Sequence, residues 1–171
     1  MKIQHLFLFA SLTALSAKAF DLDGYIMPSF GYQTVMVGDD TAGFVGRMEF
    51  ARISRGFAMD LRAGKNTKYL SYGSTFRLFE NWELGERQAL QTGVGLGAHM
   101  SDMNSAADKN FWEPLATVFA KYVFQINEKL AIGLEPELEG TSKRANVKGT
   151  PEADNSTRMR LNVSLGLLSR F

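Results

Sequence analysis

The sequence predicts an all-β fold, a closed up-and-down barrel of eight antiparallel strands. Apolar and polar residues alternate with a period of two in eight separate segments, which is the pattern of strands that present two different faces. Short and long links follow these segments in turn, as they do in a series of hairpins arranged around a barrel. Without an N-terminal leader the chain keeps about 150 residues, the size of one domain.

The first half of the chain holds four of these strands. In the first strand Ile26, Phe30 and Tyr32 share one face, and in the third Met59 and Leu61 alternate with charged residues. Alternation of this kind predicts a strand with one apolar and one polar face. The four strands are predicted at Tyr25–Val37, Phe44–Ile53, Phe57–Gly64 and Tyr69–Phe79.

The second half continues the pattern with four more strands. The clearest is the seventh, where Ile132 and Leu134 alternate with Glu135 and Glu137. The strands are predicted at Ala89–Met100, Trp112–Phe124, Leu130–Gly140 and Thr157–Phe171. Their lengths bracket the roughly 9–11 residues that a tilted strand needs to cross a membrane.

Three prolines, Pro28, Pro114 and Pro136, fall inside predicted strands. Proline cannot donate a hydrogen bond to a strand ladder, and a closed barrel has no free edge to accommodate it. We expect Pro136, in the middle of its strand, to mark a bulge or a local break.

The links form two sets, because an even number of strands places both chain ends at the same end of the barrel. The links at the opposite end are Gly38–Gly43, Lys65–Lys68, Ser101–Phe111 and Thr141–Ser156. The turns at the end with the termini are Ser54–Gly56, Glu80–Gln88 and Gln125–Lys129, of which Glu80–Gln88 is long for a turn.

The N-terminus has the composition of a cleavable signal peptide. Lys2 precedes an apolar stretch from Leu6 to Leu15, and Ala17-Lys18-Ala19 offers small residues for cleavage. The apolar stretch is shorter than the roughly 20 residues of a membrane-spanning helix. We therefore expect residues 1–19 to be a signal peptide and residues 20–171 to be the mature barrel.

Composition limits the chemistry of the mature chain. Loss of Lys2 and Lys18 leaves 17 basic residues against 18 acidic ones, so nothing in the net charge favours nucleic acid as a partner. The chain contains no cysteine, which excludes disulfides, cysteine-ligated zinc and a thiol nucleophile. We expect no cofactor and no metal.

The last segment makes the prediction more specific. Met159, Leu161 and Val163 alternate with polar residues, and the chain stops on Phe171. Together with the signal peptide, this end resembles those of Gram-negative outer-membrane β-barrels, which typically finish in an amphipathic strand with a terminal Phe that the assembly machinery recognises. The resemblance, to the small OmpA/OmpX-type porin-like barrels, covers Phe20–Phe171. It implies an outer-membrane location, with no segment remaining for a periplasmic domain.

Alternation alone does not say which face points inward. A lipocalin-like soluble barrel would place its apolar face inside, whereas an outer-membrane barrel places apolar residues in lipid and charges in the lumen. Glycines concentrate on the polar face, where an eight-stranded interior has little room, and its charges mix both signs. We therefore expect transmembrane strands around a polar plug of Arg47, Glu49, Asp60, Arg62, Arg77, Lys121, Glu135, Glu137, Glu139, Arg158 and Arg160.

Particular ion pairs follow from this orientation. A hairpin centred on the last link would place Glu139 opposite Arg158 and Glu137 opposite Arg160, and Glu49 would meet Arg62 diagonally. An unpaired buried charge costs several kcal/mol, so charges in a dry lumen need partners.

One group of residues has the ingredients of acyl transfer. His99, Ser101 and Glu113 supply a base, a hydroxyl and an orienting acid. The spacing resembles that of lipid A deacylase barrels, but that family carries its triad on the last hairpin, and here two further strands follow. A histidine and a glutamate in the lumen with a serine in a loop is the simpler interpretation.

The preferred function is structural or surface-interacting, with Ser101–Phe111 and Thr141–Ser156 as exposed contact surfaces. The expected partners are outer-membrane lipids, lipopolysaccharide and the barrel-assembly machinery, and we expect a monomer. The alternatives are a narrow transport channel, a lipid A-modifying hydrolase and a soluble periplasmic barrel.

Overall fold

The computed structural model describes residues 24–37, 42–66, 69–103, 110–141, 145–146 and 158–170. The proposed signal peptide, Phe171 and most of the two longest links lie outside these ranges. Among the described residues, no helix has the length and apolar character needed to cross a membrane.

Eight long strands correspond to the eight predicted ones. Their bounds are β1 Gly24–Val37, β2 Gly43–Arg52, β3 Phe57–Asn66, β4 Tyr69–Gly85, β5 Gln88–Met103, β6 Asn110–Gln125, β7 Leu130–Thr141 and β9 Arg158–Arg170. A two-residue strand that was not predicted, β8 Ala145–Asn146, pairs with the start of β6, and a 3-10 turn η2 occupies Ile53–Arg55.

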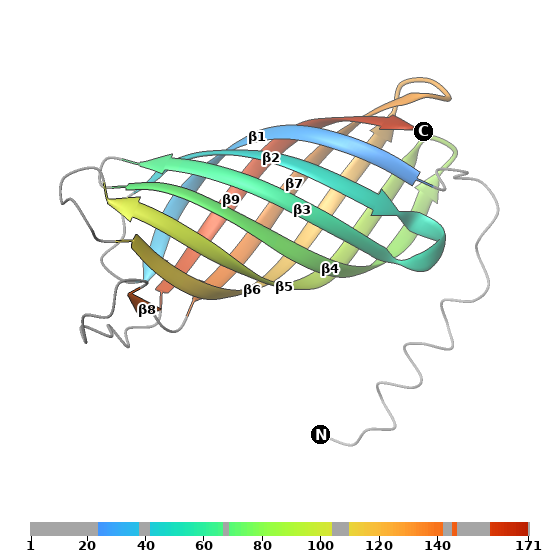
Figure 1. Ribbon diagram of the computed structural model, residues 1–171. Helices are drawn as coiled ribbons and strands as arrows, with labels where there is room; N and C mark the ends of the chain where they lie inside the picture. Colours follow the sequence, from blue (N-terminus) through green and yellow to red (C-terminus); the bar gives the residue numbers. More distant parts are fainter. Residues whose placement is uncertain are drawn as a thin grey trace, which may run out of the picture.

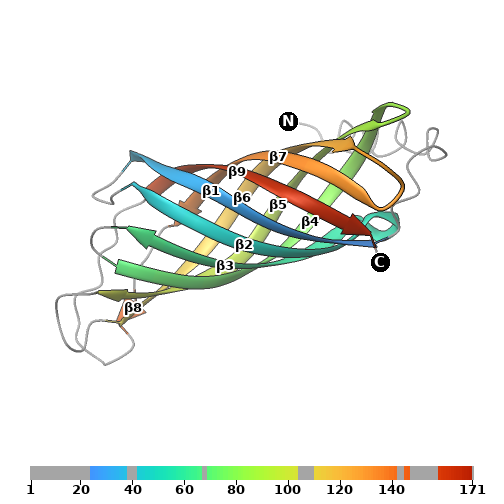
Figure 2. The ribbon, with the colours of Figure 1, turned by 90° about the horizontal axis from the view of Figure 1, so that it is seen from above.

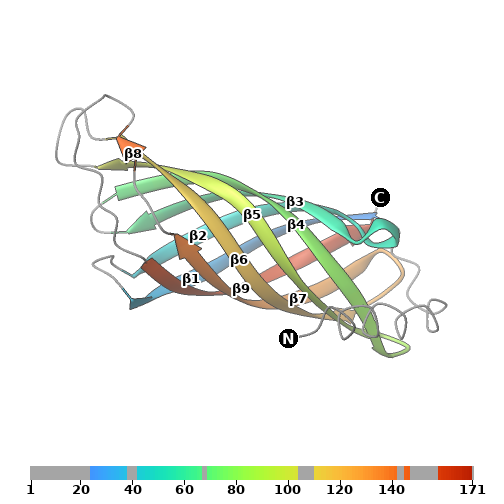
Figure 3. The same ribbon diagram turned by 90° about the horizontal axis from the view of Figure 1, so that it is seen from below.

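The strands close into an antiparallel barrel, as predicted. Each long strand pairs with its neighbours in the chain, the first pairs with the last (β1–β9), and β5–β6 pairing completes the ring. The strands run obliquely to the barrel axis (Figure 1), and views from above and below show the same continuous wall (Figures 2 and 3). We call the end with η2 and the β4–β5 and β6–β7 turns the turn end, and the opposite end the link end.

The predicted link Glu80–Gln88 was wrong, because most of it is strand. β4 continues to Gly85, β5 begins at Gln88, and only Glu86 and Arg87 form the turn. Side chains tie this part of the hairpin together, since Trp82 Nε1 donates to Thr92 Oγ1 at 3.0 Å. The apolar-polar alternation of β4 is interrupted at Phe79 and Glu80 and resumes only over Asn81–Leu84, so the periodicity did not reveal this part of the strand.

The β2–β3 turn depends on Gly56. This residue has φ 62°, in the left-handed region, and its N–H donates to Ile53 O at 3.0 Å. Its carbonyl accepts from the Phe79 N–H at 2.8 Å, and a Cβ at this position would lie 2.6 Å from Phe79 O. Any side chain here would strain the backbone and press on β4.

Each proline lies where the ladder on one side is interrupted. Pro28 lies in a gap between β1 and β9, and Pro136 lies opposite a gap at Ala120 and Lys121 of β6. The register is the same on both sides of each gap, so Pro136 marks a local break and not the bulge that was also considered. Pro114 precedes the point where β6 begins to pair with β7.

Burial alternates along most of each of the eight long strands and gives the barrel an inside-out polarity. Phe30 and Leu96 are 62% and 72% exposed on the outer wall, whereas Arg77 and Glu135 have no exposed surface. This distribution is the reverse of that in a lipocalin-like barrel, whose interior is apolar.

Candidate functional site

The barrel interior holds a set of buried charges in balance. Among the described residues, six cations and six anions are buried, so the set has no net charge when His99 is neutral. They include all eleven residues that the alternation had placed on the polar face, together with Glu113. The cations are Arg47, Arg62, Arg77, Lys121, Arg158 and Arg160, and the anions are Glu49, Asp60, Glu113, Glu135, Glu137 and Glu139.

Arg77, on β4, lies at the centre of this set. Its Nη1 lies 2.6 Å from Glu49 Oε2 of β2, and its Nη2 lies 2.8 Å from Glu135 Oε1 of β7. It also binds Glu137. One guanidinium therefore links strands from opposite parts of the chain, as its planar set of five donors allows.

Arg47 and Arg62, which face each other on β2 and β3, share the acids around them. Arg47 lies 2.7 Å from Glu135 and 3.1 Å from Asp60. Arg62 binds Asp60 and lies 3.0 Å from Glu137. Asp60 between the two guanidiniums offsets a repulsion that neighbouring like charges would otherwise feel.

Towards the turn end, Lys121 joins a polar cluster of different composition. Its Nζ donates to Tyr25 Oη at 3.0 Å and binds Glu49, and it lies 3.1 Å from Glu135. Tyr25 Oη in turn lies 2.5 Å from Glu49 Oε1 and 2.9 Å from Gln91 Oε1. Sequence reasoning missed Tyr25 and Gln91 as members of the interior network.

Below this cluster the interior is apolar, which sequence reasoning also missed. Its members come from most of the strands and fill the turn end: Tyr25, Met27, Ala51, Ala58, Phe79, Ala89, Phe119, Val123, Ala131 and Leu168. We call this set the apolar floor. The available signal was a set of apolar residues on otherwise polar faces, among them Phe119 and Val123 on β6 and Met27 on β1. The interior therefore has two layers, a charged one and an apolar one.

The ion pairs across the last hairpin differ from those predicted. Glu139 is opposite Arg160, at 2.6 Å, and Glu137 is opposite Asn162, which donates to it at 3.1 Å. The predicted register was two residues off, because the link was assumed to be symmetric. Closure of β9 against β1 sets the true register. The predicted diagonal between Glu49 and Arg62 is also replaced, since Glu49 binds Arg77 and Lys121.

Glycine makes room for these side chains. A Cβ on Gly95 would lie 2.6 Å from Thr117 Oγ1, 2.7 Å from Thr75 Cγ2 and 3.1 Å from Arg77 Cγ. These distances are too short for ordinary packing, so the charged layer fills the space that the missing side chain leaves.

The three residues considered for acyl transfer are partly brought together. His99 and Glu113 are register partners on β5 and β6, and both are buried. However, Glu113 lies 3.3 Å from both Arg158 and Arg160, and His99 Nε2 lies 3.8 Å from Glu139. The backbone of Ser101 pairs with Phe111, while its side chain lies outside the described part. No group of three or more His, Cys, Asp or Glu side chains within the described ranges is placed to hold a metal ion.

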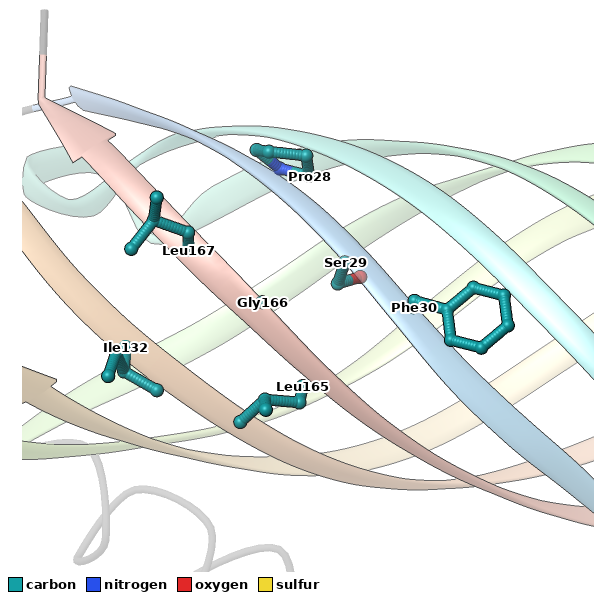
Figure 4. A pocket seen from close by; sticks show the side chains of 7 residues that line it. All are labelled: Pro28, Ser29, Phe30, Ile132, Leu165, Gly166 and Leu167. Atoms are coloured by element: carbon teal, nitrogen blue, oxygen red, sulfur yellow. The ribbon is translucent and has the colours of Figure 1, made fainter.

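The outer wall carries a hollow of about 500 Å³ where the first and last strands meet. Figure 4 shows Pro28, Ser29 and Phe30 on β1, Leu165, Gly166 and Leu167 on β9, and Ile132 on the adjacent strand β7. We call this feature the seam hollow. Its lining is apolar apart from Ser29.

Comparisons with known proteins identify the fold. No protein-family model matches the chain, and no curated protein matches it. Among solved structures, Neisserial surface protein A is similar with a TM-score of 0.71 and 11% identity, over 87% of this chain and 97% of that one. The N-terminal β-barrel domain of Pseudomonas aeruginosa OprF is similar with a TM-score of 0.53 and 12% identity, over 87% and 98%. The chain therefore has the fold of the small eight-stranded outer-membrane β-barrels.

Proposed function

We propose that the protein is an outer-membrane barrel that is closed to solutes and acts as a structural or surface-interaction protein. The observation that carries this proposal is the inside-out polarity, with paired charges inside and apolar side chains outside. In water this outer wall would be a large exposed apolar surface, whereas in a bilayer it is solvated by acyl chains.

Aromatic residues support the membrane setting. Phe44 and Trp112 are exposed near the link end, and Tyr122 and Phe124 are exposed near the turn end. Aromatic residues near both membrane interfaces are typical of transmembrane barrels. In this setting the surrounding partners are outer-membrane lipids and lipopolysaccharide, the assembly machinery reads Phe171, and the barrel is a monomer.

Two features support a closed interior. The buried charges of the described residues bind one another and balance, so they present no net charge that would attract an ion of either sign. The apolar floor fills the turn end with side chains such as Phe79, Phe119 and Leu168. Eight strands leave an interior only wide enough for side chains, so both layers obstruct passage.

A surface role places the contacts at the link end, where loops vary without disturbing the barrel. The segments Ser101–Phe111 and Thr141–Ser156 are the proposed contact surfaces. They are the longest links, and long external loops are the usual recognition surfaces of such barrels.

The first experiment combines folding and conductance. Mature protein refolded in detergent is expected to migrate differently on gels before and after boiling, because a closed barrel resists detergent. Reconstituted into planar bilayers, it is expected to give no stable current steps. The double variant Phe79→Ala, Phe119→Ala removes two large side chains from the apolar floor and is measured in the same bilayers for comparison. Reproducible current from the wild type would instead support the alternative of a narrow channel.

A second experiment tests location and orientation. Since the chain has no cysteine, Ala153→Cys in the last link and Arg87→Cys in the β4–β5 turn each introduce a single thiol. A membrane-impermeant maleimide is expected to label Ala153→Cys on intact cells and Arg87→Cys only after permeabilisation. Equal labelling of both on intact cells would contradict the orientation, and recovery of the protein in the soluble fraction would contradict the location.

A further inference from the structure

His99 is a buried histidine with one ring nitrogen outside the hydrogen-bond network. Its side chain is 5% exposed, and in the described part of the chain its Nε2 atom has no hydrogen-bond partner. The acid that faces it is Glu139, whose Oε2 atom lies 3.8 Å from Nε2, beyond the range of a hydrogen bond. His99 is also the only histidine of residues 20–171, since the other histidine of the chain is His5.

Glu139 already accepts hydrogen bonds from other side chains. Arg62 Nη1 donates to Glu139 Oε2 at 2.9 Å, and Arg160 Nη1 donates to Glu139 Oε1 at 2.6 Å. Asn162 Nδ2 also donates to Oε2, at 3.3 Å. Both carboxylate oxygens therefore have donors, and two guanidiniums balance the negative charge of Glu139 while His99 is neutral.

The surroundings of His99 come from the two adjacent strands and from across the interior. On the adjacent strands its register partners are Gly73 of β4 and Glu113 of β6. Among the described residues, the charged side chains that face it are Glu113 on β6, Arg62 on β3, Glu139 on β7 and Arg160 on β9. Each of the two acids already has two guanidinium partners, since Glu113 is paired with Arg158 and Arg160.

The ring of His99 has little room to withdraw from this position. A Cβ on Gly73 would lie 2.6 Å from Cδ2 of the imidazole, so the ring lies directly against this glycine of β4. On its other side β5 is paired with β6 through Glu113. A proton that adds to His99 therefore stays in the interior unless the neighbouring strands move apart.

Protonation changes what this ring requires of its surroundings. Both ring nitrogens become donors, and the ring gains a positive charge that is costly to bury without a partner. The acceptor beside Nε2 is Glu139 Oε2, which already accepts from Arg62. The buried cations and anions of the described residues balance only when His99 is neutral, so a proton from solution adds a cation without a matching acid.

We propose that His99 makes the barrel sensitive to acid. At neutral pH the uncharged ring completes the closed interior. In mild acid the proton is taken up where β5 and β6 separate, because the closed interior offers the charged ring no free acceptor. Acid therefore favours a barrel that is locally open beside His99, at the base of the link Ser101–Phe111. This regulation goes beyond the proposed function and does not depend on what the links bind.

The sign of the effect follows from where the proton binds. Histidine in an unfolded chain takes up a proton near about pH 6.5, whereas the closed interior resists it. Unfolding therefore consumes a proton below this pH, so the stability of the barrel is full above about pH 6.5 and falls as the pH drops. For one proton, the loss between about pH 7.5 and 5.5 is about tenfold in the equilibrium constant of folding.

Urea unfolding of the refolded mature barrel in detergent, at about pH 7.5 and about pH 5.5, tests the proposal. The wild type is expected to lose about tenfold in its folding equilibrium constant relative to His99→Gln, which keeps a polar side chain that does not ionise. Thr117→Val, a buried position of the same interior without a titrating group, is the matched control. It is expected to keep the pH dependence of the wild type. All three proteins contain the same carboxylates, so the difference isolates His99.

Hydrogen exchange locates the effect within the barrel. After correction for the intrinsic pH dependence of exchange, the backbone amides of β5 and β6 near His99 and Glu113 are expected to exchange up to about tenfold faster at the lower pH. Amides of the apolar floor, such as that of Val123, are expected to change little. The difference near His99 is expected to disappear in His99→Gln.

The imidazole NMR signals of the wild type provide a measurement that needs no variant, should His99→Gln not fold. In the mature barrel they come from His99 alone, and they are expected to remain those of a neutral ring at about pH 5.5. Titration near about pH 6.5, as in an unfolded chain, overturns the proposal, because the proton then costs nothing. Equal pH dependence of stability in wild type and His99→Gln also overturns it. So does a wild type that gains stability in acid, because pairing with Glu139 then outweighs the cost of burial.

Discussion

The guanidinium of Arg77 lies over the ring of Phe119, with its Cζ 4.2 Å from the ring centroid. The same guanidinium binds Glu49 and Glu135 through its terminal nitrogens. Arg77 therefore joins the charged layer to the apolar floor, because a delocalised cation packs on an aromatic face while its edge forms ion pairs. The charged layer and the apolar floor are therefore packed against each other.

Removal of this junction is expected to destabilise the barrel strongly. Arg77→Met removes one of the cations that Glu49 and Glu135 share, which leaves an excess of buried negative charge, and breaking a buried pair costs about 3–5 kcal/mol. The measurement is urea unfolding in detergent, followed by the gel shift of the folded barrel. Arg87→Met, in an exposed turn, is the control and is expected to change stability by less than about 0.5 kcal/mol. Equal losses of stability in Arg77→Met and Arg87→Met would show that the ion pairs of Arg77 do not contribute to the stability of the barrel.

The pair of Glu139 and Arg160 is expected to show coupling. Each single change, Glu139→Gln or Arg160→Gln, leaves one charge in the interior without its 2.6 Å partner. The double variant removes both charges, so its loss of stability is expected to be smaller than the sum of the single losses by about 0.5–3 kcal/mol. If the loss of stability in the double variant equals the sum of the two single losses, the two charges do not interact and each is solvated by water.

The fit of Gly95 leads to a test of packing. Gly95→Ala places a methyl group within 3 Å of Thr117 and Thr75, and overpacking costs about 1–3 kcal/mol. Gly140→Ala is the matched control, because its nearest atom would lie 4.0 Å away at Ala116 O. A neutral effect of Gly95→Ala would mean that the interior is looser than these distances state.

The stability of Glu113→Ala tests whether this residue has a structural or a catalytic role. Because it lies 3.3 Å from Arg158 and from Arg160, Glu113→Ala is expected to reduce stability by at least about 1–3 kcal/mol, the cost of leaving buried partners unsatisfied. Catalytic residues often carry strain, and their removal then leaves stability unchanged or higher. Loss of lipid A deacylation in Ser101→Ala, with unchanged stability of Glu113→Ala, would favour the hydrolase.

Much of the fold was predictable because alternation is local geometry. Successive side chains of a strand point to opposite faces, so Ile132 and Leu134 had to share one face and Glu135 and Glu137 the other. The prediction failed at the end of β4, where Phe79 and Glu80 interrupt the alternation although strand pairing continues. It also failed to find β8, whose two residues carry no periodic signal.

The sequence by itself determined the number of long strands, their order and the two faces of the wall, since these depend on neighbouring residues. The tertiary structure decided which charges meet. Glu139 faces Arg160 and not Arg158, because the register of β9 is set by pairing with both β7 and β1 when the ring closes. It also decided that Met27, Phe119 and Leu168, far apart in the chain, form one apolar floor. Such contacts depend on the tilt and closure of all eight strands, and no local pattern encodes them.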